Sequence, residues 1–132
     1  MDRRKKPRIV FLDTHIIVWL YFGLVKKLSN KEKQAIEDYD LYASPIAMLE
    51  TQYLFETKKI NIDANTVFSF LKNSIGLEVS TLDFISIAQA ALKLNWTRDV
   101  FDRIIVAEAL LGNAHLLSHD RLIRRYYPNT IH

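Results

Sequence analysis

Apolar residues occur along this chain in two patterns, short unbroken runs and longer runs with helical spacing. The short runs cover 8–12, 41–44, 77–80 and 115–118, and they are typical of strands buried on both faces of a sheet. Between these runs, apolar residues recur every three or four positions, which predicts helices. Because helices separate the predicted strands, we expect one α/β domain with right-handed crossovers and a central parallel sheet flanked by helices.

The helical segments carry residues that are typical of helix ends. Ser29 and Glu32 have the spacing of a capping box, and Ser44 stands as an N-cap before a proline. Gly112 is expected to end the sixth helix. The predicted helices cover 14–23, 29–38, 44–59, 63–73, 82–95, 99–114 and 120–127.

The composition fits one cytoplasmic domain and limits its chemistry. The chain has 132 residues and is 49% hydrophobic, which is enough for a core in a single domain. The absence of cysteine excludes disulfides and thiolate metal ligands and favours a reducing compartment. No apolar run approaches the roughly 20 residues of a membrane span. We therefore expect a soluble, cytoplasmic protein without a signal peptide.

The net charge of +3 depends largely on the N-terminus, where positions 3 to 8 hold five basic residues. We expect residues 1–7 to form a basic tail and residues 8–132 to form the domain. The charge is mildly favourable for a polyanionic partner, but a solvated terminus explains it at least as well.

Four acidic residues are placed so that they could meet at one edge of the sheet. Asp13 follows the first predicted strand and Asp120 follows the last, and ligands of α/β folds bind outside the carboxyl ends of strands. Glu50 lies early in a helix among apolar residues, although an exposed position or a lysine partner would also explain it. Asp102 lies in the first turn of a helix, where it could simply complement the helix dipole.

Converging carboxylates would repel one another, and their pKa values would rise unless a cation compensated the charge. Without cysteine, such a cluster selects hard divalent ions, Mg²⁺ or Mn²⁺. A water bound to such an ion is a nucleophile for phosphodiester hydrolysis. Asp99, three residues before Asp102, is either a further member of the cluster or an N-cap.

Four segments, in this order and spacing, resemble the PIN-domain ribonucleases, most closely the VapC-type toxins of toxin–antitoxin pairs. They are FLDTH (11–15), SPIAMLE (44–50), DVFDRIIVAEAL (99–110) and LLSHD (116–120). The resemblance implies a PIN-like domain with four or five parallel strands. It also implies a Mg²⁺- or Mn²⁺-dependent endoribonuclease that hydrolyses RNA, a protein antitoxin as partner, and a homodimer.

The resemblance also assigns residues to the site. The expected metal-binding and catalytic residues are Asp13, Glu50, Asp102 and Asp120, and the candidate accessory residues are Asp99, Thr14 and Ser118. Arg103 and Arg121 are candidates for contacting the substrate, although an ion pair is the simpler expectation for Arg103. Glu108 stands where many relatives have glutamine and is expected outside the site. His15 and His119 are expected to lie at the surface or to form supporting hydrogen bonds.

Three aromatic-rich stretches have no assigned chemistry. WLYFGL (19–24) and YLFETKKI (53–60) predict core or an interface, and the resemblance favours contacts with a second copy or an antitoxin. RLIRRYY (121–127) could guide RNA by charge and stacking, but a solvated face is an equally good interpretation.

Other functions are weighed against the ribonuclease. A phosphotransferase of the haloacid-dehalogenase type needs a second aspartate two residues after the first, where His15 stands. A response-regulator receiver needs an acid pair before its phosphorylated aspartate and a lysine at a strand end, and neither is evident. A non-catalytic PIN-like module that binds RNA or protein, and a stand-alone RNA-processing nuclease, stay open as alternatives.

Overall fold

The computed structural model describes residues 8–132, so the expected basic tail lies outside the described residues. All pairings in its five-stranded sheet are parallel, in the order β3-β2-β1-β4-β5. The strands are β1 (Ile9–Leu12), β2 (Asp40–Ala43), β3 (Glu78–Val79), β4 (His115–Leu117) and β5 (Thr130–Ile131). The predicted α/β fold is confirmed. β5 has no counterpart in the apolar pattern, because Thr130 and Ile131 do not form an apolar run.

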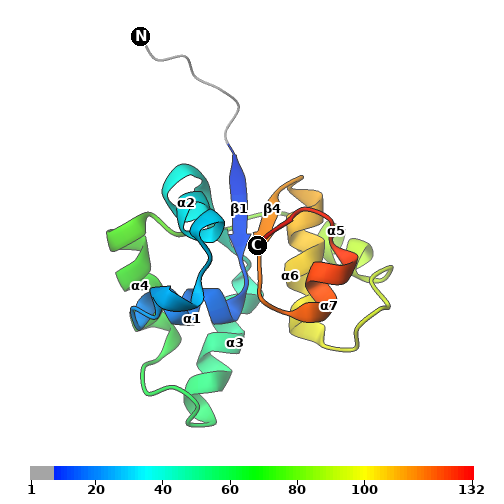
Figure 1. Ribbon diagram of the computed structural model, residues 1–132. Coiled ribbons are helices and arrows are strands. Elements are labelled where there is room, and N and C mark those ends of the chain that lie inside the picture. The colour runs from blue at the N-terminus through cyan, green and yellow to red at the C-terminus, as the bar shows by residue number, and fades with distance from the viewer. Residues whose placement is uncertain (1–7) are drawn as a thin grey trace.

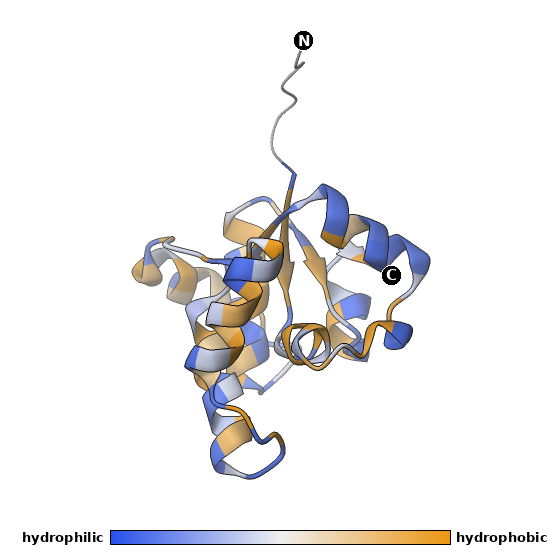
Figure 2. Ribbon diagram, turned by 90° about the vertical axis from the view of Figure 1, so that its left-hand side faces the viewer, coloured by the Kyte–Doolittle hydropathy of each residue, from blue (hydrophilic) through white to orange (hydrophobic). Residues whose placement is uncertain are grey.

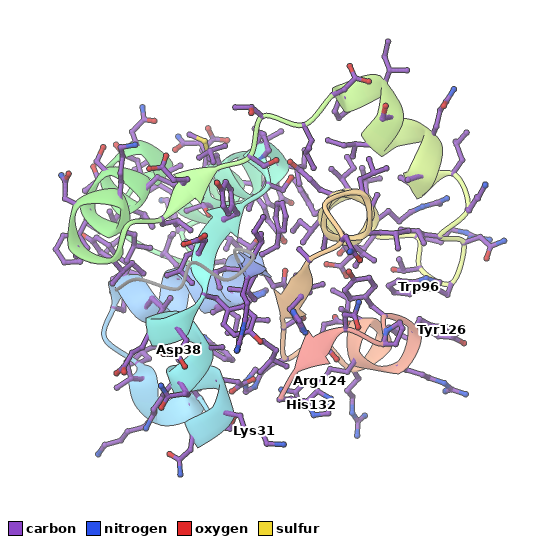
Figure 3. All side chains as sticks on the ribbon, turned by 90° about the horizontal axis from the view of Figure 1, so that it is seen from above. Lys31, Asp38, Trp96, Arg124, Tyr126 and His132 are labelled. Carbon is purple, nitrogen blue, oxygen red and sulfur yellow. The ribbon has the colours of Figure 1, made fainter. Side chains whose placement is uncertain are left out.

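Helices cover both faces of the sheet (Figure 1). They are α1 (Thr14–Tyr21), the 3₁₀ turn η1 (Val25–Lys27), α2 (Asn30–Asp38), α3 (Pro45–Glu56), α4 (Ala64–Ile75), α5 (Phe84–Ala91), α6 (Val100–Leu111) and α7 (Arg121–Tyr126). Seen from above, α1, α2 and α4 lie on one side of the sheet and α5, α6 and α7 on the other (Figure 3). This is the arrangement that right-handed crossovers produce when strand order reverses.

The core lies around the two central strands. Val10, Leu12, Leu116 and Leu117 are completely buried, and the strands at the centre of the molecule are coloured as hydrophobic (Figure 2). Unbroken apolar runs are expected here because helices exclude water from both faces. Among residues 8–132, no helix is both long and apolar enough to cross a membrane.

The helix starts agree with the sequence, whereas several helix ends come earlier than expected. Ser29 and Glu32 form the predicted capping box, and Ser44 caps α3. Gly112 follows α6 as its C-cap. The first and third predicted helices are shorter in the structure because the chain leaves helical geometry at Gly23, with φ of 72°, and at Lys58, with φ of 63°. Left-handed residues of this kind end helices.

The strand order changes direction between β1 and β4: β2 and β3 lie on one side of β1, and β4 and β5 lie on the other. β1 pairs with β2 on one side and with β4 on the other. The backbone N–H of Asp13 donates to the Leu117 carbonyl at 3.0 Å, which extends this pairing one residue beyond β1. The crevice outside the carboxyl ends of β1 and β4 is therefore the place where this topology binds ligands.

Candidate active site

A cavity of about 210 Å³ occupies this crevice, and acidic side chains dominate its lining. The sheet contributes acids that directly follow β1 and β4, while α3 and the start of α6 contribute the others. Of the residues that line it, none is lysine or arginine. The lining residues are Asp13, His15, Trp19, Glu50, Asp99, Asp102, His119 and Asp120. All four acids expected in the site, together with Asp99, are thus brought to one cavity.

Asp13 is the most firmly held of these acids. It is the N-cap of α1 and is only 5% exposed. Its Oδ1 accepts from the Thr14 N–H at 2.8 Å, and its Oδ2 accepts from the Ser118 hydroxyl at 2.7 Å. Burial raises the pKa of Asp13 and Asp120 adds to the rise, although both hydrogen bonds and His15 oppose it.

Ser118 connects the two strand-end acids. Its hydroxyl donates to Asp13 and accepts from the Asp120 N–H at 3.0 Å. Asp120 is in turn the N-cap of α7, where its Oδ1 accepts from the Ile123 N–H at 3.0 Å. The candidate accessory hydroxyl therefore joins the Asp13 carboxylate to the Asp120 backbone.

The pKa of Asp102 indicates that the acids lie close to one another. Burial raises its pKa to about 8, with further contributions in decreasing order from Asp13, Asp99, Asp120 and Glu50. Asp99 is the N-cap of α6 and accepts from the Asp102 N–H at 3.1 Å, which confirms the capping interpretation. A carboxyl whose pKa is raised by all four neighbouring carboxyls lies in a cluster whose charge is not compensated by the protein.

Glu50 is half-buried, and among residues 8–132 it has no lysine partner. Burial raises its pKa, Asp13 and Asp99 contribute to the rise, and the nearby Thr14 hydroxyl opposes it. Thr14 is completely buried, and within residues 8–132 its hydroxyl makes no hydrogen bond of good geometry. Buried hydroxyls normally have a partner, and the effect on the pKa of Glu50 makes that carboxyl the nearest candidate.

The donor chemistry fits a hard divalent ion. The cluster offers carboxylate oxygens without thiolates, which is the ligand set that Mg²⁺ and Mn²⁺ prefer. With the side chains as they stand in residues 8–132, no three acidic or imidazole groups are close enough to bind one ion. Rotation of side chains would be needed to complete a coordination shell.

A second buried acid, Glu32 on α2, lies beside this cavity and was expected only as part of a capping box. It is completely buried, and its carboxylate oxygens lie 2.8 and 2.9 Å from Nε2 of His119. It also accepts from Arg124 at 3.1 Å, and Nε of Arg124 donates to the Ser118 carbonyl at 2.8 Å. These partners are 87 and 92 residues away along the chain, so no local sequence signal indicates them.

The two arginines proposed for substrate contact occupy different positions. Arg103 donates to the Ala91 carbonyl at 3.2 and 2.9 Å and to the Leu92 carbonyl at 3.3 Å, at the end of α5. Within residues 8–132 it forms no ion pair. Its guanidinium instead donates to carbonyls at the end of a helix, which have no partner within the helix. Arg121 is exposed at the first residue of α7. Contact with the substrate stays a prediction for both.

A larger cleft of about 870 Å³ adjoins the acidic cavity, since Trp19 lines both. The aromatic-rich stretches 19–24 and 53–60 meet in it. Its lining includes Trp19, Phe22, Leu24, Phe55 and Ile60 as well as Lys58 and Lys59. The two stretches thus form one continuous, largely apolar surface next to the acids.

Comparison with known proteins places this fold in a family. The model of the PIN domain matches residues 10–128, and the chain belongs to that family. One chain in the crystal structure of VapBC2 from Rickettsia felis bound to a DNA fragment from the promoter is 19% identical to this chain, with a TM-score of 0.66. The match covers 94% of this chain and 99% of that chain.

A chain of a toxin–antitoxin complex from Klebsiella pneumoniae is 18% identical with a TM-score of 0.64. The match covers 93% of this chain and 96% of that one. At these identities the likeness concerns the fold. The search of curated proteins finds no match.

Proposed function

We propose that this protein is a Mg²⁺- or Mn²⁺-dependent endoribonuclease and the toxin of a VapBC-type toxin–antitoxin pair. The observation that carries the proposal is the gathering of five acids around one cavity whose lining holds no lysine or arginine. Such a cluster is unfavourable without a cation, and strongly perturbed carboxyls in a cleft are typical of active sites. Membership of the PIN domain family supports the same activity.

Asp13, Glu50, Asp102 and Asp120 would hold the ion. When bound, it lowers the pKa of a water molecule and offsets the negative charge that develops at phosphorus. In the hydrolysis, the water oxygen bonds to phosphorus, the bond from phosphorus to the leaving ribose oxygen breaks, and that oxygen takes up a proton. Asp102, whose pKa is about 8 without metal, would give up its proton when the ion binds, because a metal ligand must be deprotonated.

The toxin assignment rests on the surface beside the acids. A free ribonuclease would endanger its own cell, so an inhibitor is expected. The apolar cleft suits an amphipathic helix, and the acidic cavity suits an arginine, which pairs bidentately with carboxylates. Because Trp19 lines both, one partner would fill the cleft and reach the acids. The similarity to the toxin–antitoxin complexes supports this choice.

We also propose that the protein is cytoplasmic and forms a homodimer. Large apolar side chains are exposed on α3 and α5, namely Leu49, Tyr53, Phe84 and Ile85. Exposed apolar groups of this kind mark interaction surfaces when they are contiguous. Light scattering on the purified protein tests the dimer, which a monomeric mass at all concentrations would exclude.

The central test is expression of this chain alone, followed by RNA cleavage in vitro. We expect growth arrest that needs intact Asp13 and is relieved by co-expression of a neighbouring gene. The purified protein should cleave RNA with Mn²⁺ or Mg²⁺ and not with EDTA. Harmless expression of a protein that cleaves RNA would favour the stand-alone nuclease. A protein that binds no Mn²⁺ in calorimetry and cleaves no RNA would favour the non-catalytic module.

A further inference from the structure

We propose that Glu32 and Arg124 are positioning residues for the metal site, acting through Ser118. This inference rests on the proposed function, because it concerns the same acids. Neither residue lines the acidic cavity. Each is linked to Asp13 and Asp120 by hydrogen bonds that meet at Ser118, where Arg124 bonds the carbonyl, and the Asp13 carboxylate and the Asp120 backbone N–H bond the hydroxyl.

The series begins at the buried carboxylate of Glu32. The guanidinium of Arg124 uses two different nitrogens: one terminal nitrogen donates to Glu32 at 3.1 Å, and Nε donates to the Ser118 carbonyl at 2.8 Å. Figure 3 shows Arg124 on the side of α7 that faces α2. Glu32 therefore fixes the plane of the guanidinium, and the guanidinium fixes the peptide group that follows Ser118.

The same serine carries the link to the acids. Its hydroxyl must keep one rotamer in order to donate to Asp13 at 2.7 Å while accepting from the Asp120 N–H at 3.0 Å. A shift of Ser118 would disturb both contacts. The position of the Asp13 carboxylate relative to the Asp120 backbone thus depends on a contact that starts on α2.

Glu32 also holds one wall of the cavity. His119 contacts both of its oxygens, at 2.8 and 2.9 Å, and the His119 ring lies edge-on against Trp19 with ring centroids 5.0 Å apart. Both rings line the acidic cavity. A single buried carboxylate therefore orients a ring of the wall and, through Arg124, the backbone between β4 and α7.

The charged groups of this network are suited to holding the backbone at Ser118 in one position. Glu32 is completely buried, and a buried carboxylate needs charged or hydrogen-bonding partners. Its partners include a guanidinium, which is the only side chain able to donate from two different nitrogens in a fixed plane. Lysine at position 124 would keep the positive charge near Glu32 but could not also hold the Ser118 carbonyl in the same geometry. This difference separates positioning from simple charge compensation.

The experiment measures Mn²⁺ affinity by calorimetry, at a temperature well below the melting temperature of every variant. The test variants are Arg124→Lys and Glu32→Gln. The matched control is Glu78→Gln, which removes the 3.1 Å ion pair between Glu78 and Lys72. That ion pair lies outside the network. If Glu32→Gln does not fold, Arg124→Lys carries the test alone.

We expect each test variant to lose about 10-fold or more in Mn²⁺ affinity, the usual loss when a residue that orients metal ligands is changed. The control should bind as the parent does. In a double-mutant cycle, Arg124→Lys and Ser118→Ala should lower the affinity by less than the product of their separate effects, because they act through one series of contacts.

A merely structural role predicts a different result. The variants would then melt at lower temperature and bind Mn²⁺ as tightly as the parent, which would overturn this inference and leave the proposed function standing. Fully independent effects in the double-mutant cycle would also overturn it. A parent protein that binds no Mn²⁺ would overturn the proposed function and this inference together.

Discussion

Asp13 and Glu32 are both buried carboxyls, yet their surroundings are opposite. Glu32 is completely buried and is paired with Arg124 and His119. Asp13 is 5% exposed, and it faces a cavity lined by four further acids with no lysine or arginine. The two groups are linked through Ser118, so one connected network contains a compensated charge at one end and uncompensated charges at the other.

This difference indicates what each region does. A paired buried acid is costly to disturb because removal of one partner leaves an unpaired charge. An unpaired cluster raises the pKa values of its members and is relieved by a cation. On the proposed function, the region of Glu32 would be a support, and the region of Asp13 would be a binding site. Five predictions test this contrast.

Asp13→Asn should have the largest effect, a loss of RNA cleavage of about 100- to 1,000-fold, comparable to the removal of one stabilising group in an active site. The substitution is nearly isosteric and relieves repulsion, so the stability of the metal-free protein should hold or rise. Cleavage of a labelled RNA and thermal melts measure both effects. Asp63→Asn is the control, since Asp63 is an N-cap of α4 remote from the cavity. An Asp13→Asn protein as active as the parent would exclude this role.

Glu32→Met should lower the free energy of unfolding by about 3–5 kcal/mol, because it leaves Arg124 without its carboxylate. Urea unfolding of the metal-free variant and parent measures the difference. If the stability is unchanged, Glu32 does not form a supporting network and the contrast with Asp13 fails.

The sequence predicts the fold and the gathering of the acids at one cavity because both depend on regular patterns. An apolar run that ends at an acid predicts a strand that places a carboxyl at the sheet edge, which holds for β1 with Asp13 and for β4 with Asp120. The N-cap role of Asp99 also follows from local spacing.

The supporting contacts could not be predicted in this way. Glu32 has all the local features of a capping residue, while its partners His119 and Arg124 come from the other end of the chain. Arg103 likewise meets α5 carbonyls that are close only after folding. Tertiary packing, which local spacing does not encode, decides all three contacts.

Mn²⁺ should stabilise the parent by about 2.7 kcal/mol when its concentration is 100 times the dissociation constant, because it binds only the folded state. Thermal melts over a range of Mn²⁺ concentrations measure this effect. Asp102→Asn should remove most of it by deleting a ligand, whereas Glu78→Gln should leave it unchanged. Equal stabilisation of parent and Asp102→Asn would place the ion elsewhere.

Glu108→Met should raise the free energy of unfolding, whereas Glu32→Met should lower it. Glu108 on α6 is completely buried, and neither of its carboxyl oxygens has a hydrogen-bond partner in the part of the chain that the structure describes, residues 8–132. An unsatisfied buried polar group costs about 1–3 kcal/mol, so methionine, of similar shape, should raise the free energy of unfolding by up to about that amount. Urea unfolding gives the sign. Destabilisation by Glu108→Met would indicate that this carboxyl has partners of its own and resembles Glu32.

The smallest expected effect is a shallow pH dependence of stability in the metal-free protein. The pKa of Asp102 is raised to about 8, whereas an unfolded aspartate titrates near pH 4. Between these values the folded state binds more protons, so the free energy of unfolding should fall as pH rises from about 4 to about 8. Solvent screening of this half-buried group keeps the slope small.

Urea unfolding at a series of pH values, without metal, measures the slope. Asp102→Asn should flatten it, and saturating Mn²⁺ should reverse it, because the ion competes with protons for the same oxygens. Asp63, whose pKa is lowered by its hydrogen bonds to Thr66, titrates below this range, so Asp63→Asn should leave the slope unchanged and serves as the control. A parent protein whose stability does not change over this range, or changes equally after Asp102→Asn, would show that the acids do not repel one another as their grouping implies.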